Sequence, residues 1–249
     1  MTQKIKKIID FFNDDTLYYS ASLSFFTIFS LLPILALLIV IISTVPAFEN
    51  HISLFTLYLL DFINPTHSTQ IASSISEFLS NSNDLGSIGI FYLLFVFTLF
   101  FNNYEDIVNK IYNVEKRPIY QMFFLYLSFL ILIPMLFILF VLTTTFLKGN
   151  ISTEITTFIF MWGLFIVIFK ISPNTNISLN SAAIGSFITL ATLSITKKLF
   201  TIYVLYNTTY TTIYGSFSIL LFFFLWIYIS WSIYLYGTKI TALINAKTK

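Results

Sequence analysis

The sequence predicts an all-α membrane protein with six transmembrane helices, and three observations lead to this prediction. Hydrophobic residues make up 57% of the 249 residues and charged residues only 10%, whereas a water-soluble domain carries about 25% charged residues. Several apolar runs approach the roughly 20 residues that a helix needs to cross the hydrocarbon core. Runs such as 88–101 and 219–236 do not alternate in polarity, as the strands of a membrane β-barrel would.

Six segments are expected to span the membrane. Their approximate bounds are 20–45, 85–101, 119–147, 151–171, 179–205 and 214–246. The second continues through a polar stretch to Lys110, and the sixth exceeds the hydrocarbon thickness, so its end is expected to project into the cytoplasm or to tilt. Small residues in the fifth segment favour close packing against another helix: Ser181, Ala182, Gly185 and Ser186. With no tandem repeat or linker, residues 1–249 are expected to form a single domain.

Two further helical segments flank the first span. Apolar residues recur at helical spacing in residues 5–12 beside several lysines, which predicts a short amphipathic helix in the cytoplasmic interface. Residues 46–85 contain neither lysine nor arginine. Their apolar stretches are too short or too amphipathic to span, so they are expected to form a cap of two short helices on the outer side.

The basic residues predict the orientation of the chain, because cytoplasmic segments are enriched in lysine and arginine. With the N-terminus in the cytoplasm, ten of the 13 basic residues lie on inner segments. Only Lys148 lies outside, and Lys197 and Lys198 lie within a span. Both termini are therefore expected in the cytoplasm.

Composition excludes several classes of site. The chain has no cysteine, so neither disulfides nor thiolate metal sites are available. His51 and His67 lie away from any carboxylate cluster, so no metal site is expected. None of the seven glycines fits a P-loop, so we expect no cofactor and no ATP bound in that way. The net charge of +2 is too small to suggest a nucleic-acid partner.

Motifs of one known protein family follow one another in order along nearly the whole chain. In the last two spans they are Ser172-Pro173-Asn174, Gly185-Ser186, Lys198 with Phe200 and Tyr203, Tyr214-Gly215, Phe224-Leu225-Trp226-Ile227-Tyr228 and Gly237. Earlier motifs are Ala21, Phe25-Phe26, Ser30-Leu31-Leu32-Pro33, Asn102-Asn103 and Tyr112-Asn113. On these residues the chain resembles the YihY/BrkB family, which implies a six-helix protein of the bacterial inner membrane. The family often has Ala-Glu where this chain has Thr238-Lys239, so no role of that acid is carried over.

The resemblance implies less about function. Family members were once labelled a tRNA-processing ribonuclease, and others have been linked to serum resistance or to transport of lipid-type envelope components. The residues argue against a nuclease, because Glu105-Asp106 are the only adjacent acids on the expected cytoplasmic side and no histidine faces that side. We therefore expect no enzymatic activity and no catalytic residue.

Lys197 and Lys198 are the sharpest functional signal, because a charge within an apolar segment must face a bundle interior, a cavity or the interface. Two interpretations of Lys198 stay open. It snorkels to the outer headgroups, or it faces a cavity and holds an anionic headgroup such as phosphate. The family match at Lys198 favours the cavity. The predicted substrate-binding set also includes a polar cluster at the inner end of span two and two tyrosines near the last loop: Asn102, Asn103, Glu105, Asp106, Tyr203 and Tyr214.

These features together predict an inner-membrane transporter or flippase-like protein that handles an anionic lipid or a lipid-linked envelope component. Its partners are membrane lipids, and the oligomeric state is open. The alternative is a non-transporting scaffold or envelope-assembly factor that works through residues 46–85. A sealed bundle with no cavity reaching Lys198 would favour the scaffold.

Overall fold

The computed structural model describes residues 11–12, 14–43, 69–80, 86–146, 153–206, 212, 214–215 and 217–248, and every element within these ranges is an α-helix. The six predicted spans are present as helices, which confirms the all-α polytopic fold. They are α2 (Thr16–Ser43), α5 (Gly86–Ile111), α6 (Ile119–Phe146), α7 (Thr153–Ile171), α8 (Leu179–Tyr206) and α10 (Phe217–Thr248). Five are long and apolar enough to cross a membrane, and α7 contributes the shorter apolar helix Ile155–Ile171.

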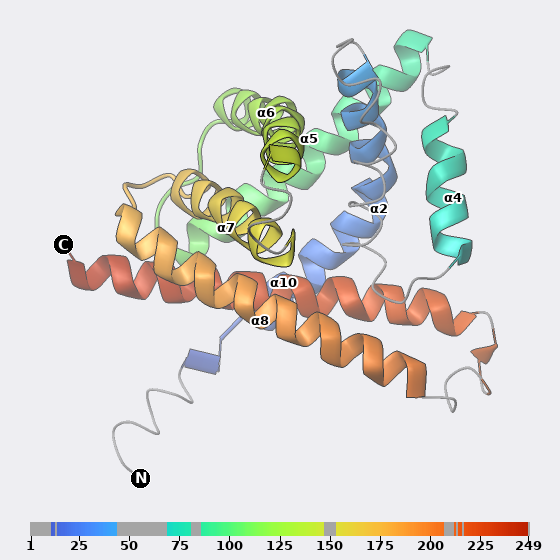
Figure 1. The fold of residues 1–249 in the computed structure, drawn as a ribbon. Coiled ribbons are helices and arrows are strands. Elements are labelled where there is room, and N and C mark those ends of the chain that lie inside the picture. The colour runs from blue at the N-terminus through green and yellow to red at the C-terminus, as the bar shows by residue number, and fades with distance from the viewer. Residues whose placement is uncertain are drawn as a thin grey trace.

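The two C-terminal helices form the base on which the others are arranged. Figure 1 shows α8 and α10 side by side as a long antiparallel hairpin, with the other helices largely on one side of it. Helix α7 packs on α8, whereas α2 packs on both α10 and α5. Helix α4 (Thr69–Ser80) lies beside α2. The interior of the bundle is therefore formed where α2, α5, α6 and α7 meet the hairpin.

Two sequence predictions fall largely outside the described residues. Of the amphipathic helix expected at 5–12, the structure describes only residues 11–12, which are helical. Of the cap expected at 46–85, it describes essentially α4, in which Ile75 is buried. His51 and His67 also lie outside the described ranges. The amphipathic helix and the cap as a whole remain predictions.

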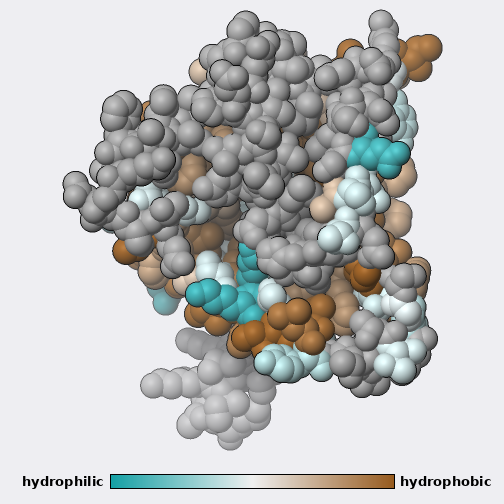
Figure 2. Space-filling model, turned by 45° about the vertical axis from the view of Figure 1, so that its right-hand side comes forward, coloured by the Kyte–Doolittle hydropathy of each residue, from teal (hydrophilic) through white to brown (hydrophobic). Residues whose placement is uncertain are grey.

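The surface of the bundle is suited to lipid. Phe91 on α5, Phe124 on α6 and Leu199 on α8 expose 74%, 65% and 61% of their surface. Where the face in Figure 2 shows described residues, apolar and weakly polar ones predominate and strongly hydrophilic ones form small patches. Exposed apolar surface of this extent is unfavourable in water, so these helices are expected to contact the hydrocarbon of a membrane.

The loop between α5 and α6 is fixed by a well-defined helix end. Asn113 takes a left-handed conformation with φ of 55°, which asparagine tolerates better than most residues. The Asn113 N–H donates to the Lys110 carbonyl and the Val114 N–H to the Asn109 carbonyl, the pair of bonds that closes a Schellman motif. The chain then turns back, and Pro118 precedes the first residue of α6.

The start of α2 is tied to the end of α10. The Asp14 carboxylate accepts hydrogen bonds from the Thr16 N–H at 3.2 Å and the Thr16 hydroxyl at 2.8 Å, which caps α2. Lys239 of α10 forms an ion pair with Asp14 at 2.6 Å and also donates to the Phe11 carbonyl. The beginning of the first span and the last turns of the sixth therefore lie on the same side of the bundle, as an even number of spans requires.

This tether predicts a pH-dependent contribution to stability. Burial favours the neutral form of Asp14, but the hydrogen bonds from Lys239 and Thr16 outweigh it and lower the pKa of this carboxyl below its ordinary value of 3.8. The stabilisation is present above that ordinary value and is lost as the pH falls through the lowered pKa. Lys239→Met is therefore expected to lower the thermal midpoint at about pH 7 and to lower it less at about pH 2, where only the hydrogen bond to the Phe11 carbonyl is lost.

The control for this prediction is Lys247→Met in the last turn of α10, which should change neither midpoint. If Lys239→Met lowers the thermal midpoint by the same amount at both pH values, the charge of Asp14 does not contribute to the loss of stability.

Candidate functional site

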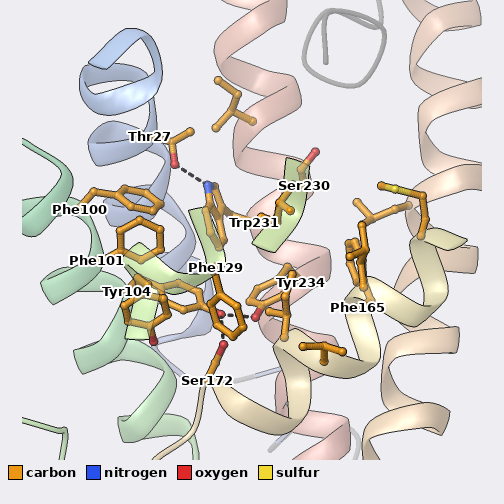
Figure 3. A pocket seen from close by; sticks show the side chains of 18 of the residues that line it. Thr27, Phe100, Phe101, Tyr104, Phe129, Phe165, Ser172, Ser230, Trp231 and Tyr234 are labelled. Atoms are coloured by element: carbon orange, nitrogen blue, oxygen red, sulfur yellow. Dashed lines mark hydrogen bonds between the residues drawn. The ribbon is translucent and has the colours of Figure 1, made fainter. Parts of the chain in front are cut away.

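A cavity of about 420 Å³ lies between the helices, partly open to the surface of the bundle, and is lined by residues of all six spans and by Ser172. This volume falls in the range of about 300–1,000 Å³ that is usual for ligand pockets. Aromatic side chains dominate the part shown in Figure 3, where Phe100, Phe101 and Tyr104 extend from α5 and Trp231 and Tyr234 from α10. None of the described residues that line the cavity carries a charge. The cavity thus offers an apolar environment for a ligand.

Hydroxyl groups gather at one end of the cavity. The Tyr104 hydroxyl donates to the Ser172 Oγ at 3.0 Å, and the hydroxyls of Tyr104 and Tyr234 are hydrogen-bonded to each other. Tyr104 is 5% exposed and Ser172 1%. Elsewhere along the wall, the Trp231 Nε1–H donates to the Thr27 Oγ1 at 2.8 Å. Figure 3 shows the Thr27–Trp231 pair above the group of Tyr104, Tyr234 and Ser172. The apolar cavity therefore has a distinct polar end.

A buried ion pair lies next to this polar end. Glu105 is fully buried, and its carboxylate lies 2.9 Å from Arg117 Nη1. The same carboxylate accepts hydrogen bonds from the Tyr126 hydroxyl at 2.5 Å and from Asn109 Nδ2 at 2.8 Å. The Arg117 backbone N–H adds a fourth donor at 3.2 Å. The negative charge of Glu105 is thus compensated by a cation and by three further donors.

Arg117 also joins two loops of the bundle. Its guanidinium donates to the carbonyls of Ile171, Ser172 and Pro173 at 2.9, 2.7 and 2.8 Å. These carbonyls follow the last turn of α7, where backbone acceptors lack partners within the helix and the helix dipole favours a cation. Arg117 therefore fixes the loop between α5 and α6 to the end of α7, and with it the position of Ser172 at the cavity.

Two asparagines secure the loop between α7 and α8. Asn109 Oδ1 accepts from the Asn174 N–H at 2.6 Å, and Asn245 Oδ1 of α10 accepts from the Ser178 N–H at 2.9 Å. The Ser178 hydroxyl in turn accepts from the Ser181 N–H at 3.1 Å, which caps the start of α8. Asn109 of α5 and Asn245 of α10 thus hold the loop between α7 and α8 in place, and Ser178 fixes the start of α8.

The four predicted site residues on α5 point in different directions. Glu105 faces the interior and Asn103 Nδ2 donates to the Ser22 Oγ of α2 at 3.3 Å. Asp106 forms ion pairs with Lys110 and Lys116 at 2.6 and 3.9 Å, and Lys116 also reaches Asn102 at 3.4 Å. The structure therefore brings Asn102 and Asp106 together and separates them from Glu105. Among the described residues, no group of three His, Asp or Glu side chains could hold a metal ion.

The other four predicted residues lie toward the opposite end of the hairpin. Lys198 is exposed on α8 and Lys197 is half-buried, and neither lines the cavity. Tyr203 and Tyr214 are 44% and 48% exposed. Lys198 lies 19 residues beyond the start of α8, which is about 28 Å along the helix axis. The cavity therefore does not reach Lys198, which meets one half of the condition set above for the scaffold, although the bundle is not sealed. The contact of Lys198 with a headgroup stays a prediction.

The predicted substrate-binding set did not include the residues that form the polar end of the cavity and its support: Tyr104, Arg117, Tyr126, Ser172 and Tyr234. One signal could have found Arg117, because it is the only arginine in a chain whose other cations are all lysines. Arginine is preferred where a planar group must donate several hydrogen bonds at once. The tyrosines carry no comparable signal among 15 tyrosines.

These helices and their apolar surface define a multi-pass α-helical membrane protein with an internal cavity. The sequence model of the family described as "Virulence factor BrkB" matches residues 8–249. The chain therefore belongs to this family, which confirms the resemblance drawn from its motifs.

Three similar relatives are named as membrane proteins. A UPF0761 membrane protein of Pseudoalteromonas atlantica is 29% identical over 238 residues, which cover 90% of this chain and 79% of the relative. A second, from Pseudoalteromonas translucida, is 28% identical and covers 98% of this chain and 85% of the relative. A third, from Aggregatibacter aphrophilus, is 26% identical, and the match covers 94% of this chain and 88% of the relative. None of these names states an enzymatic activity, and no solved structure matches the chain.

Proposed function

We propose that this protein is a flippase-like transporter of the bacterial inner membrane that moves an anionic lipid or a lipid-linked envelope component and is not itself driven by ATP. The observation that carries this proposal is the apolar cavity between the six spans, which is partly open to the surface of the bundle. Apolar clefts of this volume with a few polar groups are typical of ligand sites. A scaffold that only holds other proteins needs no such space, whereas a protein that takes up a lipid chain does.

The distribution of polar groups supports movement between two sides. In the predicted orientation Ser172 and Tyr104 lie toward the cytoplasmic side, and Lys198 lies in the outer half of α8, eight residues before Tyr206. That separation from the helix end is about 12 Å. Lys198 is exposed, so it is accessible to the headgroup of a lipid on the outside of the bundle. We assign it the contact with an anionic headgroup at that level.

The experiment is a lipid-movement assay with the full chain. The protein is reconstituted into vesicles with fluorescent phosphatidylglycerol, and the rate is measured at which inner-leaflet probe becomes accessible to a membrane-impermeant reductant. Wild-type protein should accelerate movement over protein-free vesicles. Lys198→Ala is expected to slow it roughly ten- to a hundred-fold, because a hydrogen bond to a charged group contributes about 1.5–3 kcal/mol.

The matched control is Lys170→Ala, which removes an exposed lysine from the last turn of α7 and should leave the rate unchanged. Equal rates for wild type and Lys198→Ala would show that Lys198 does not contact the headgroup, but they would not reject the transport proposal. A wild-type rate no faster than that of empty vesicles would reject the transport proposal and favour the scaffold.

A further inference from the structure

The hydroxyl groups at the polar end of the cavity leave one donor unused. Tyr104, Tyr234 and Ser172 each carry a single O–H proton, and two hydrogen bonds join the three groups. Because the Tyr104 proton is donated to Ser172, the second bond is donated by Tyr234. The remaining proton is that of Ser172, for which no described residue provides an acceptor. Ser172 is 1% exposed and lines the cavity.

A buried donor without an acceptor is costly, and native structures rarely contain one. The donor of Ser172 therefore favours a ligand in the cavity that supplies an oxygen acceptor at this end. The position of the donor is well fixed, since the Ser172 carbonyl is bound by Arg117 at 2.7 Å. The acceptor would thus meet a preorganised partner.

The same surroundings disfavour a charged acceptor. None of the described lining residues is cationic. The nearby Arg117 directs its Nη1 and Nη2 groups to Glu105 and to three backbone carbonyls. A phosphate or carboxylate at Ser172 would therefore be buried without a counter-charge, which is strongly unfavourable. A neutral oxygen, such as the carbonyl of an ester, does not incur this cost.

The rest of the cavity suits a hydrocarbon chain. Phe101, Phe129 and Trp231 form part of its wall, and Thr27 of α2 lies at its other side. Thr27 is 11 residues beyond the start of α2, which places it about 16 Å along that helix. The cavity thus extends from the hydroxyl groups near one end of the bundle toward its middle, as a lipid chain extends from its ester into a leaflet.

We propose that the cavity binds the uncharged ester end of a lipid together with its hydrocarbon chain, and that the Ser172 hydroxyl donates to the ester carbonyl. Any charged headgroup of that lipid stays outside the cavity. This inference rests on the proposed function, because it names the part of the transported lipid that enters the bundle.

The test uses the two tryptophans of the cavity wall, Trp226 and Trp231, whose fluorescence is quenched by bromine atoms on a bound chain. Full-length protein in nanodiscs is titrated with methyl 9,10-dibromostearate, with the dibromostearate anion and with 9,10-dibromooctadecane, which has no ester. Saturable quenching by the methyl ester is expected to weaken about two- to ten-fold in Ser172→Ala, the range for one neutral hydrogen bond. The alkane should bind both proteins equally.

Ser172→Ala keeps the backbone carbonyl that Arg117 binds, so the loop is expected to fold normally. Should this variant fail to fold, Leu164→Phe is the second test, because it narrows the cavity from α7 and adds no tryptophan to the fluorescence signal. Its expected effect is weaker saturable quenching by both the ester and the alkane. Unchanged quenching by both in a folded Leu164→Phe protein would overturn the inference.

Two further probes identify the source of the ester. Ser172-dependent quenching by brominated diacylglycerol would indicate a neutral lipid. Ser172-dependent quenching by brominated phosphatidylglycerol would indicate that the cavity binds the acyl end of an anionic lipid. Both results support the inference. Equal ester affinity in wild type and Ser172→Ala, tighter binding of the anion than of its ester, or no saturable quenching at all would overturn it.

The two proposals can fail separately. Lipid movement in vesicles without any Ser172 effect on ester binding would overturn this inference and leave the transport function. Ser172-dependent ester binding without lipid movement would support the inference and overturn transport.

Discussion

Replacing Arg117 by alanine is expected to lower the free energy of unfolding by about 3–5 kcal/mol, the cost of leaving a buried charge without its partner. The Glu105 side chain is 1% exposed and that of Arg117 16%, so neither charge is well solvated. The substitution also frees the carbonyls of Ile171, Ser172 and Pro173 from their donor. Stability is measured as the unfolding midpoint in a denaturant titration of the detergent-purified protein.

Lys116→Ala is the matched control, because Lys116 precedes Arg117 in the same loop but is 45% exposed and lies 3.9 Å from Asp106. Exposed ion pairs contribute about 0–1 kcal/mol, so its midpoint should stay near that of wild type. Adding Glu105→Gln to Arg117→Ala removes the stranded charge and should restore part of the loss. If Arg117→Ala is as mild as Lys116→Ala, the buried pair does not stabilise the protein.

The sequence predicted the helices well because apolar length sets the spans and several boundaries have a local chemical cause. Apolar length set the spans, Pro173 follows the end of α7, and Ser178 caps α8. The second helix was expected to continue through its polar stretch to Lys110, and α5 ends at Ile111. Its end is fixed by Asn113 in the left-handed conformation, a feature that the local sequence can also specify.

The polar end of the cavity could not be predicted in this way because its contacts are not local. Tyr104 meets Ser172 across 68 positions and Tyr234 across 130. Side-chain direction was a second obstacle, since neighbouring helical residues point about 100° apart. Glu105 consequently lies in the interior while Asp106 pairs with exposed lysines, although both read as one acidic pair in the sequence.

The small residues of α8 show how a local pattern becomes a specific contact. A Cβ atom on Gly185 would lie 1.8 Å from Thr241 Oγ1, and one on Gly237 would lie 1.7 Å from Thr189 Oγ1. The arrangement is reciprocal, because each threonine hydroxyl also donates to the glycine carbonyl four residues earlier on its own helix, at 2.8 and 2.9 Å. This confirms the close packing predicted for the fifth span.

Gly237→Ala is accordingly expected to destabilise the protein by about 1–3 kcal/mol, because the new methyl group forces α8 and α10 apart. Adding Thr189→Gly, which removes the three atoms nearest to the new Cβ, should recover part of this loss. Gly163→Ala on α7 is the control, since a Cβ there meets nothing within 4 Å, and it should be neutral or slightly stabilising. The same denaturant titration compares the variants. A Gly237→Ala protein as stable as the Gly163→Ala protein would mean that the two helices can separate at this point without loss, and that the hairpin is held together elsewhere.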